Sequence, residues 1–231
     1  MLKKMINYFT PAELGLWLFS VLLIVLSFAV FGAHSRLTPA ASLIGVTSLI
    51  FNAKGHPAGQ ALMVIFSLLY GIISYSFAYY GEMLTYVGMT MPMALYSMIA
   101  WLKNPYNGNR SEVAVNHISK KEQAVMWGVT AAVTALFYFI LKYFNTANLP
   151  LSTVSVTTSF LAVYLTARRS PAYALAYAAN DVVLIMLWLL ASISDCSYTP
   201  VAVCFAAFLA NDIYGFASWR KMARRQSAGK L

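Results

Sequence analysis

Eight apolar segments, separated by short polar connections, dominate this chain and restrict what it can fold into. They cover residues 14–32, 38–52, 58–79, 83–102, 123–144, 150–167, 171–193 and 198–218. About 20 apolar residues in a helix cross the hydrocarbon core of a bilayer. A chain with 60% hydrophobic and only 10% charged residues also has too little polar surface for a soluble globule. We therefore expect an all-α polytopic membrane protein with eight transmembrane helices, the second of them short.

The first segment, residues 14–32, has the position of a signal peptide but not its form. It is longer than the apolar region of a typical signal peptide, and no small-residue cleavage site follows it. We expect it to be kept as a mature transmembrane helix.

The basic residues predict how the helices are oriented. If the N-terminus is cytoplasmic, all but two of the 16 Lys and Arg residues lie on the inner side, and the exceptions are Arg36 and Lys142. The inner residues are Lys3, Lys4, Lys54, Lys103, Arg110, Lys120, Lys121, Arg168, Arg169, Arg220, Lys221, Arg224, Arg225 and Lys230. This bias follows the positive-inside rule, so both termini are expected in the cytoplasm. Because the bases lie in short clusters between apolar runs, the net charge of +9 does not indicate a nucleic-acid partner.

The last two apolar segments each carry the tripeptide Ala-Asn-Asp in their interior, at residues 179–181 and 210–212. A carboxylate and an amide inside a lipid-length helix are costly, so they normally face a protein interior or a watery cavity. Aromatic residues follow at helical spacing: Trp188 lies two turns beyond Asp181, and Tyr214 lies one turn beyond Asn211. We expect a solute pathway lined by Asn180, Asp181, Trp188, Asn211, Tyr214 and Tyr177, with Asp212 and Pro92 at its gate or mouth. The alternative is that either amide only joins neighbouring helices.

The third and fourth segments add polar groups to this pathway. Gln60 and Tyr70 belong to a row of polar residues at three- and four-residue spacing, which predicts one inward face of the third segment. Gln60 is interpreted as a site residue, a cytoplasmic gate or a cap. Glu82, in the turn between the two segments, is expected at the outer mouth of the pathway. Pro92 predicts a kink, because it leaves a backbone carbonyl without its helical partner.

The remaining large aromatic residues near segment ends are expected to lie at the membrane interfaces. Trp101 and Trp219 each stand beside the basic residues that end a segment, so they are interpreted as inner anchors. Tyr79, Tyr80 and Tyr86 are expected in the outer aromatic belt.

An internal repeat organises the segments. Residues 52–57 resemble residues 166–171, and each stretch lies between the first and second segments of a triplet. Trp101-Leu-Lys103 resembles Trp219-Arg-Lys221, and each lies at the end of a triplet. Three spans leave the chain on the opposite side of the membrane, so two triplets that run in the same direction need one linker span between them. This predicts the order of one extra helix, three helices, one linker helix and three helices (1+3+1+3), with parallel repeats. The expected divisions are a tail with the extra helix, the first repeat, a cytoplasmic loop, the linker helix, the second repeat and a basic tail. These divisions cover residues 1–37, 38–103, 104–122, 123–147, 148–221 and 222–231.

Several short motifs, in this order, resemble those of the PnuC nicotinamide riboside transporters. They are Asn52-Ala-Lys-Gly followed by Gln60, Tyr70-Gly71-Ile-Ile-Ser74-Tyr75, Tyr80-Gly81-Glu82-Met83, Trp101-Leu-Lys-Asn104 and Tyr214-Gly215-x3-Trp219-Arg-Lys221. The resemblance implies a SWEET-like fold and facilitated diffusion of nicotinamide riboside, an NAD precursor, across a bacterial inner membrane. Phosphorylation inside the cell would trap the vitamin. Similar proteins take thiamine or riboflavin, and a homo-oligomer, such as a trimer, is expected.

Other classes of function have less support in the sequence. A membrane enzyme would need a catalytic cluster, but His34, His56 and His117 fall in loops. Cys196 and Cys204 indicate neither a disulfide framework nor a zinc site, so no metal or cofactor is expected. A sensor would usually append a signalling domain. A proton-coupled symporter stays open, because Asp181 or Asp212 could carry a proton.

Overall fold

The protein is described here by a computed structural model that covers residues 8–32, 36–76 and 80–229. The sequence expectations for His34, Tyr79, Lys3, Lys4 and Lys230 fall outside the described residues. Within the described part the fold is helical apart from one two-stranded hairpin. Among the described residues, seven helices are long and apolar enough to cross a membrane, and Leu37–Ala53 is a shorter apolar helix. The prediction of an all-α polytopic membrane protein is confirmed at this level.

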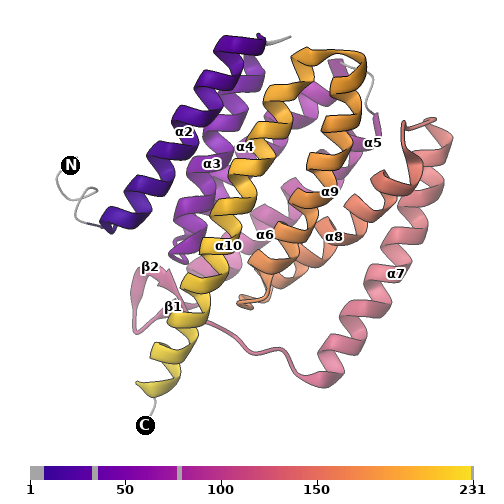
Figure 1. Cartoon of the computed structure of the whole chain (residues 1–231). Coiled ribbons are helices and arrows are strands. Elements are labelled where there is room, and N and C mark those ends of the chain that lie inside the picture. Colours follow the sequence, from indigo (N-terminus) through magenta and orange to yellow (C-terminus); the bar gives the residue numbers. More distant parts are fainter. Residues whose placement is uncertain (1–7, 33–35, 77–79, 230–231) are drawn as a thin grey trace.

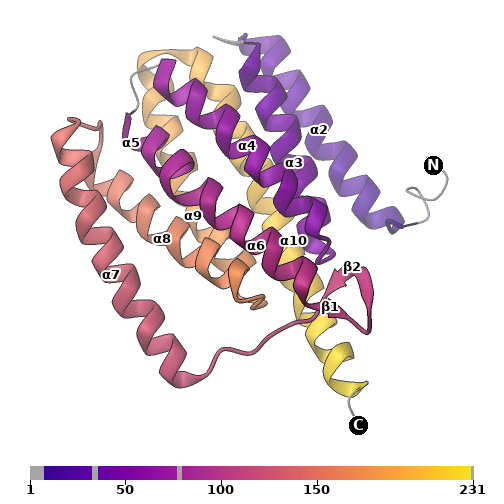
Figure 2. The same cartoon turned by 180° about the vertical axis from the view of Figure 1, so that it is seen from behind.

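The elements follow one another in an up-and-down order (Figure 1). In chain order they are α2 (Pro11–Phe31), α3 (Leu37–Ala53), α4 (Pro57–Ser76), α5 (Tyr80–Met83), the π-helix η1 (Leu84–Thr90), α6 (Met91–Lys103), β1 (Pro105–Tyr106), β2 (Asn109–Val113), α7 (Lys120–Tyr143), α8 (Leu149–Ala167), α9 (Tyr173–Ser194), the 3-10 helix η2 (Cys196–Tyr198) and α10 (Thr199–Ala228). Figure 2 shows α7 at the edge of the bundle, where it packs mainly against α8.

Helix α2 begins with a capping box that the sequence spells out as Thr-Pro-x-Glu. The backbone N–H of Thr10 donates to Glu13 Oε2 over 2.7 Å, and the N–H of Glu13 donates to Thr10 Oγ1 over 3.3 Å. Pro11 fits the first turn because its missing N–H has no helical partner there. The helix then packs against α3 and α10.

The fourth span is interrupted just before Pro92, as the proline predicts. A proline ring has no N–H to donate to the carbonyl four residues earlier, so the regular ladder cannot pass through it. The chain instead widens into the seven-residue π-helix η1, and the N–H of Met91 donates to the carbonyl of Tyr86. Thr90 Oγ1 adds a bond of 3.2 Å to the carbonyl of Thr85. Short π-helical turns of this kind often mark functional segments.

The polar stretch after α6 forms a hairpin that supports the end of α10. Asn107 and Gly108 both have positive φ, 48° and 77°, which is the backbone of a type I′ turn. Gln226 Nε2 donates to Glu112 Oε1 over 2.8 Å and to the carbonyl of Val113 over 3.0 Å. The helix continues to Ala228, so most of the expected basic tail is helical, contrary to the predicted end at residue 218. The end of the bundle that carries this hairpin is called the hairpin end below.

The buried side chains form two clusters, one on each side of the bundle's middle. The cluster toward the hairpin end holds Trp101, Tyr173 and Trp219. The other includes Tyr70 and Tyr86, whose ring centroids are 4.4 Å apart. Tyr86 is only 8% exposed, so the belt position expected for it is wrong. It lies in η1 and points toward α4, where packing against another aromatic ring replaces contact with the interface.

Candidate functional site

The amide of Asn180 is held by hydroxyl groups of α8. Ser155, Thr158 and Ser159 place their hydroxyls 3.2, 2.9 and 3.1 Å from Asn180 Oδ1. Because these residues recur at three- and four-residue spacing, they share one face of α8, opposite α9. The carbonyl end of the amide is therefore fixed toward α8. Its donor end, Nδ2, points away from those hydroxyls.

The carboxyl groups of the two tripeptides meet between α9 and α10. Asp181 and Asp212 are 3% and 4% exposed, and their carboxyl groups interact directly. Asp181 Oδ2 has no hydrogen-bond partner among the described residues. Tyr177 lies within electrostatic reach of both carboxyl groups. Two adjacent carboxylates repel each other strongly away from water, so a proton or another cation between them would stabilise the pair.

Aromatic rings from three spans surround Tyr70. Its ring lies 4.4 Å from Tyr86 and 6.4 Å from Trp188, the latter in an edge-to-face arrangement. Trp188 also lines a cavity of about 60 Å³ together with Glu82, at the end of the bundle opposite the hairpin. The structure thus brings Tyr70, Trp188 and Glu82 together along one route. The volume accommodates a few water molecules but not a nucleoside, for which several hundred cubic ångströms are typical.

Three residues expected in the pathway make their hydrogen bonds to other helices. Asn211 Nδ2 donates to Ser20 Oγ of α2 over 2.9 Å and to the carbonyl of Ala207 over 2.8 Å. Gln60 Nε2 donates to Asn52 Oδ1 of α3 over 2.8 Å. The third residue, Tyr214, also turns toward α2. The bonds of Asn211 and Tyr214 therefore lie on the α2 side of α10 and that of Gln60 joins α4 to α3, while Asn211 Oδ1 has no hydrogen-bond partner among the described residues.

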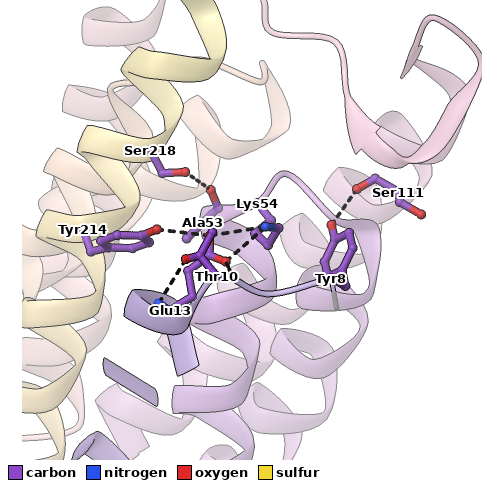
Figure 3. A network of polar contacts seen from close by, with 8 residues as sticks. All are labelled: Tyr8, Thr10, Glu13, Ala53, Lys54, Ser111, Tyr214 and Ser218. Carbon is purple, nitrogen blue, oxygen red and sulfur yellow. Dashed lines mark hydrogen bonds and ion pairs between the residues drawn. The ribbon is translucent and has the colours of Figure 1, made fainter. Parts of the chain in front are cut away.

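Glu13 is a buried acid that the sequence analysis overlooked. It is 3% exposed and lies 3.1 Å from Lys54 Nζ, and Tyr214 donates its hydroxyl to Glu13 Oε1 over 3.1 Å (Figure 3). The Lys54 ammonium in turn lies 4.7 Å from the centre of the Tyr8 ring. The capping-box pattern Thr10-Pro-x-Glu13 is the signal that identifies this glutamate from sequence. Its contacts join α2, α3 and α10 at the hairpin end.

Trp101 and Trp219 form a reciprocal contact in the interior of the hairpin end. The indole N–H of Trp101 donates to the carbonyl of Thr166 over 3.0 Å, and that of Trp219 donates to the carbonyl of Asn52 over 2.8 Å. Their ring centroids are 5.4 Å apart, and the side chains are 1% and 0% exposed. The expectation that they anchor the interface is wrong. The ends of α3 and α8 offer carbonyls that satisfy a buried indole N–H.

The comparisons with known proteins agree with this fold. The family model described as "Nicotinamide mononucleotide transporter" matches residues 35–221. The chain belongs to this family. It is 25% identical to the nicotinamide riboside transporter PnuC of Neisseria mucosa over 218 residues, which are 92% of this chain and 82% of that protein. It is 22% identical to the PnuC of Haemophilus influenzae over 193 residues, which are 83% of this chain and 82% of that protein.

A solved structure extends the family match to three dimensions. The crystal structure of the vitamin B3 transporter PnuC superposes with a TM-score of 0.81 and covers 94% of each chain at 23% identity. The two chains therefore share a fold. The resemblance to PnuC that the motifs indicated is confirmed, and the relatives named here are transporters rather than enzymes.

Proposed function

We propose that this protein carries nicotinamide riboside, an NAD precursor, into the bacterial cell by facilitated diffusion, with intracellular phosphorylation as the trap. The family and the named substrate of the relatives support this function. The observation that carries it is the pair of buried carboxyl groups of Asp181 and Asp212 between membrane-crossing helices, with the partly buried Tyr177 beside the pair and the buried Trp188 two turns along α9. A cationic pyridinium ring is stabilised by aromatic faces and by negative charge, and buried carboxyls supply that charge.

Within this site we assign each residue a role from its contacts. Asp181 and Asp212 face the cationic ring, while Trp188 and Tyr70 pack against it. The Nδ2 donor of Asn180 serves the ribose hydroxyls or the carboxamide oxygen. Tyr177, Glu82 and Pro92 complete the proposed route, the first beside the carboxyls, the second at the outer mouth and the third after η1. The hydrogen bonds of Asn211, Tyr214 and Gln60 favour a helix-bracing role for these three.

We further propose that the helices follow the 1+3+1+3 plan with parallel repeats. The triplets are then α3, α4 and α5 to α6, followed by α8, α9 and α10, with α2 as the extra helix and α7 as the linker. The reciprocal tryptophan contacts support this arrangement, because Trp101 and Trp219 bond to carbonyls at corresponding positions of the other triplet. The third helix of each triplet likewise packs against the first helix of the other.

The bias of basic residues supports an orientation with the hairpin end and both termini in the cytoplasm. We also propose a homo-oligomer such as a trimer. The exposed side chains of α7, among them Trp127 at 57% and Phe139 at 67%, provide an apolar face for lipid or for a second copy.

A proton-coupled symporter is the second candidate, and the Asp181–Asp212 pair favours it. A symporter must carry the proton and the riboside together, and the pair allows this because one carboxyl holds the proton while the other, ionised, faces the cationic ring. Uptake into proteoliposomes with and without an imposed pH gradient distinguishes the candidates. A facilitator equilibrates the riboside regardless of the gradient, whereas a symporter accumulates it.

The substrate is tested by calorimetric titration of the purified protein with nicotinamide riboside, thiamine and riboflavin. We expect heat of binding for the riboside and little for the other two vitamins. Binding of thiamine or riboflavin without binding of the riboside would replace the proposed substrate with that vitamin.

A further inference from the structure

A second cavity, of about 570 Å³, opens at the hairpin end between α10 and the turn that joins α8 to α9. Its walls include His117, Ser170, Phe216, Arg220, Arg224 and Ser227. This volume falls within the range of small-molecule sites in proteins. The cavity shares no lining residue with the proposed riboside site.

The two arginines of this cavity, Arg220 and Arg224, belong to none of the ion pairs described at the hairpin end. Glu13 pairs with Lys54, Glu112 with Arg225 and Glu122 with Arg168. Neither Arg220 nor Arg224 has a carboxylate partner within the described part of the chain. They lie one turn apart on α10, so both guanidinium groups are offered to the same cavity. The local charge is therefore positive and uncompensated.

The N-terminus of α9 forms the opposite wall. Ala172, its N-cap, makes no side-chain capping bond, and Ser170 accepts bonds from the N–H of Ala172 (3.4 Å, to Oγ) and of Tyr173 (3.1 Å, to the carbonyl). The next N–H groups of this 22-residue helix, those of Ala174 and Leu175, have no partner within the helix. The corresponding start of α4 is arranged in the same way, because His56 Nδ1 accepts a bond of 3.0 Å from the N–H of Ala58. A helix N-terminus attracts anions through its remaining free N–H groups and its dipole.

We propose that this cavity binds a phosphate-bearing ligand, with phosphate oxygens held by Arg220 and Arg224 and facing the N-terminus of α9. Guanidinium groups bind phosphate through paired hydrogen bonds, and a helix N-terminus adds further donors. Phe216, whose ring centre is 5.6 Å from the Arg220 guanidinium carbon, offers an apolar surface beside the charge. The phosphate belongs either to a soluble phosphate ester or to an anionic lipid head group. Phosphate binding by this cavity does not depend on the proposed orientation of the protein. Only the statement that the cavity faces the cytoplasm depends on it.

The soluble source is tested with the full-length protein in a neutral detergent, freed of bound lipid. Nicotinamide mononucleotide and inorganic phosphate serve as probes in calorimetric titrations. The double variant Arg220→Gln, Arg224→Gln should bind the mononucleotide at least about tenfold more weakly than wild type, since hydrogen bonds to charged groups are lost. Lys221→Gln is the matched control, because Lys221 is an exposed base on the same helix outside the cavity.

The lipid source is tested in nanodiscs of phosphatidylcholine with and without phosphatidylglycerol. If the ligand is a lipid, phosphatidylglycerol should raise the Tm of wild type and of Lys221→Gln but not that of the double variant. Binding of the mononucleotide without this Tm effect assigns the site to a soluble ester. The proposal is overturned if both probes fail, or if the double variant responds like wild type.

Riboside binding separates this inference from the proposed function. The double variant should keep wild-type affinity for nicotinamide riboside, because neither arginine lines the proposed riboside site. If the protein bound no riboside but bound phosphate through these arginines, the proposed function would fail and the phosphate site would stand.

Discussion

Adjacent residues on a helix point about 100° apart, and this separates the amide from the carboxyl in each Ala-Asn-Asp tripeptide. Asn180 turns toward the hydroxyls of α8, and Asn211 turns toward Ser20 of α2. Asp181 and Asp212 therefore turn toward each other. The repeated tripeptide gives the same division twice: the amide bonds a neighbouring helix and the carboxyl faces the space between α9 and α10.

Replacing the groups closest to the proposed ligand should weaken binding. We expect Trp188→Ala to lower the affinity for nicotinamide riboside several-fold or more, because stacking on a cationic ring contributes roughly 0.5 to 2 kcal/mol beyond contact area. Asn180→Ala should also weaken binding several-fold, through loss of the Nδ2 donor. Calorimetry on folded protein measures both. Trp127→Ala, in the exposed face of α7, is the control and should bind the riboside with wild-type affinity. Wild-type affinity in both Trp188→Ala and Asn180→Ala would show that the riboside binds at another site.

Tyr214 should matter for stability rather than for binding. Its hydroxyl donates to the buried carboxylate of Glu13, and hydrogen bonds to charged groups contribute roughly 1.5 to 3 kcal/mol. Tyr214→Phe keeps the ring and removes this bond, so the Tm in detergent should fall while riboside affinity stays unchanged. Tyr143→Phe, at a position that is 80% exposed, should leave the Tm as it is. Loss of binding by Tyr214→Phe at an unchanged Tm would return Tyr214 to the ligand site.

At the scale of elements, the two tryptophans hold the hairpin ends of the triplets together. Trp219→Phe removes the bond to the carbonyl of Asn52, which costs about 0.5 to 1.5 kcal/mol, and the smaller ring leaves a gap that adds to the loss. We expect a lower free energy of unfolding in chemical denaturation. Trp127→Phe, where the side chain is 57% exposed, is the matched control. Equal stability of Trp219→Phe and wild type would show that this contact does not support the fold.

The start of α4 should make stability depend on pH. Burial lowers the pKa of His56 below its usual 6.5, and the neutral ring accepts the N–H of Ala58 at Nδ1. The folded state therefore favours the neutral ring. Its contribution is present above about pH 6.5 and is lost as the pH falls through the lowered pKa, where the protonated ring also opposes the helix dipole. We expect Tm to fall between about pH 7 and about pH 5 more in wild type than in His56→Asn, which keeps a capping acceptor.

Periodicity and chemistry within one element were sufficient to predict the spans and the break at Pro92. Contacts between elements were not predictable in the same way. The position of Trp219 beside basic residues suits an interface anchor, and only the packing of α10 against α3 brings its N–H to a free carbonyl. Likewise, nothing local to Asn211 reveals that α2 covers its face of α10. Glu13 could have been identified from the sequence by its capping-box pattern, Thr10-Pro-x-Glu13.

For the whole molecule, the proposed orientation predicts which end of the bundle a reagent outside the cell can reach. In the proposed orientation the hairpin end is inside, and Cys196, in the turn between α9 and α10, lies outside. Cys196 is exposed, while Cys204 is buried and 3% exposed, so the chain carries its own outer probe. We expect a membrane-impermeant maleimide to label wild-type protein in intact cells and Cys196→Ser to remain unlabelled.

The inner side needs a matched probe, and the hairpin turn provides it. Asn107→Cys in a Cys196→Ser background places one exposed thiol at the tip of the hairpin, although the positive φ at this position suits asparagine better than cysteine. This thiol should react only after the cells are permeabilised, because the positive-inside rule retains the neighbouring bases in the cytoplasm. Labelling of this variant in intact cells, together with protection of Cys196, would invert the orientation. The basic cavity beside α10 would then face the outside, where phosphorylated products of the cell do not accumulate.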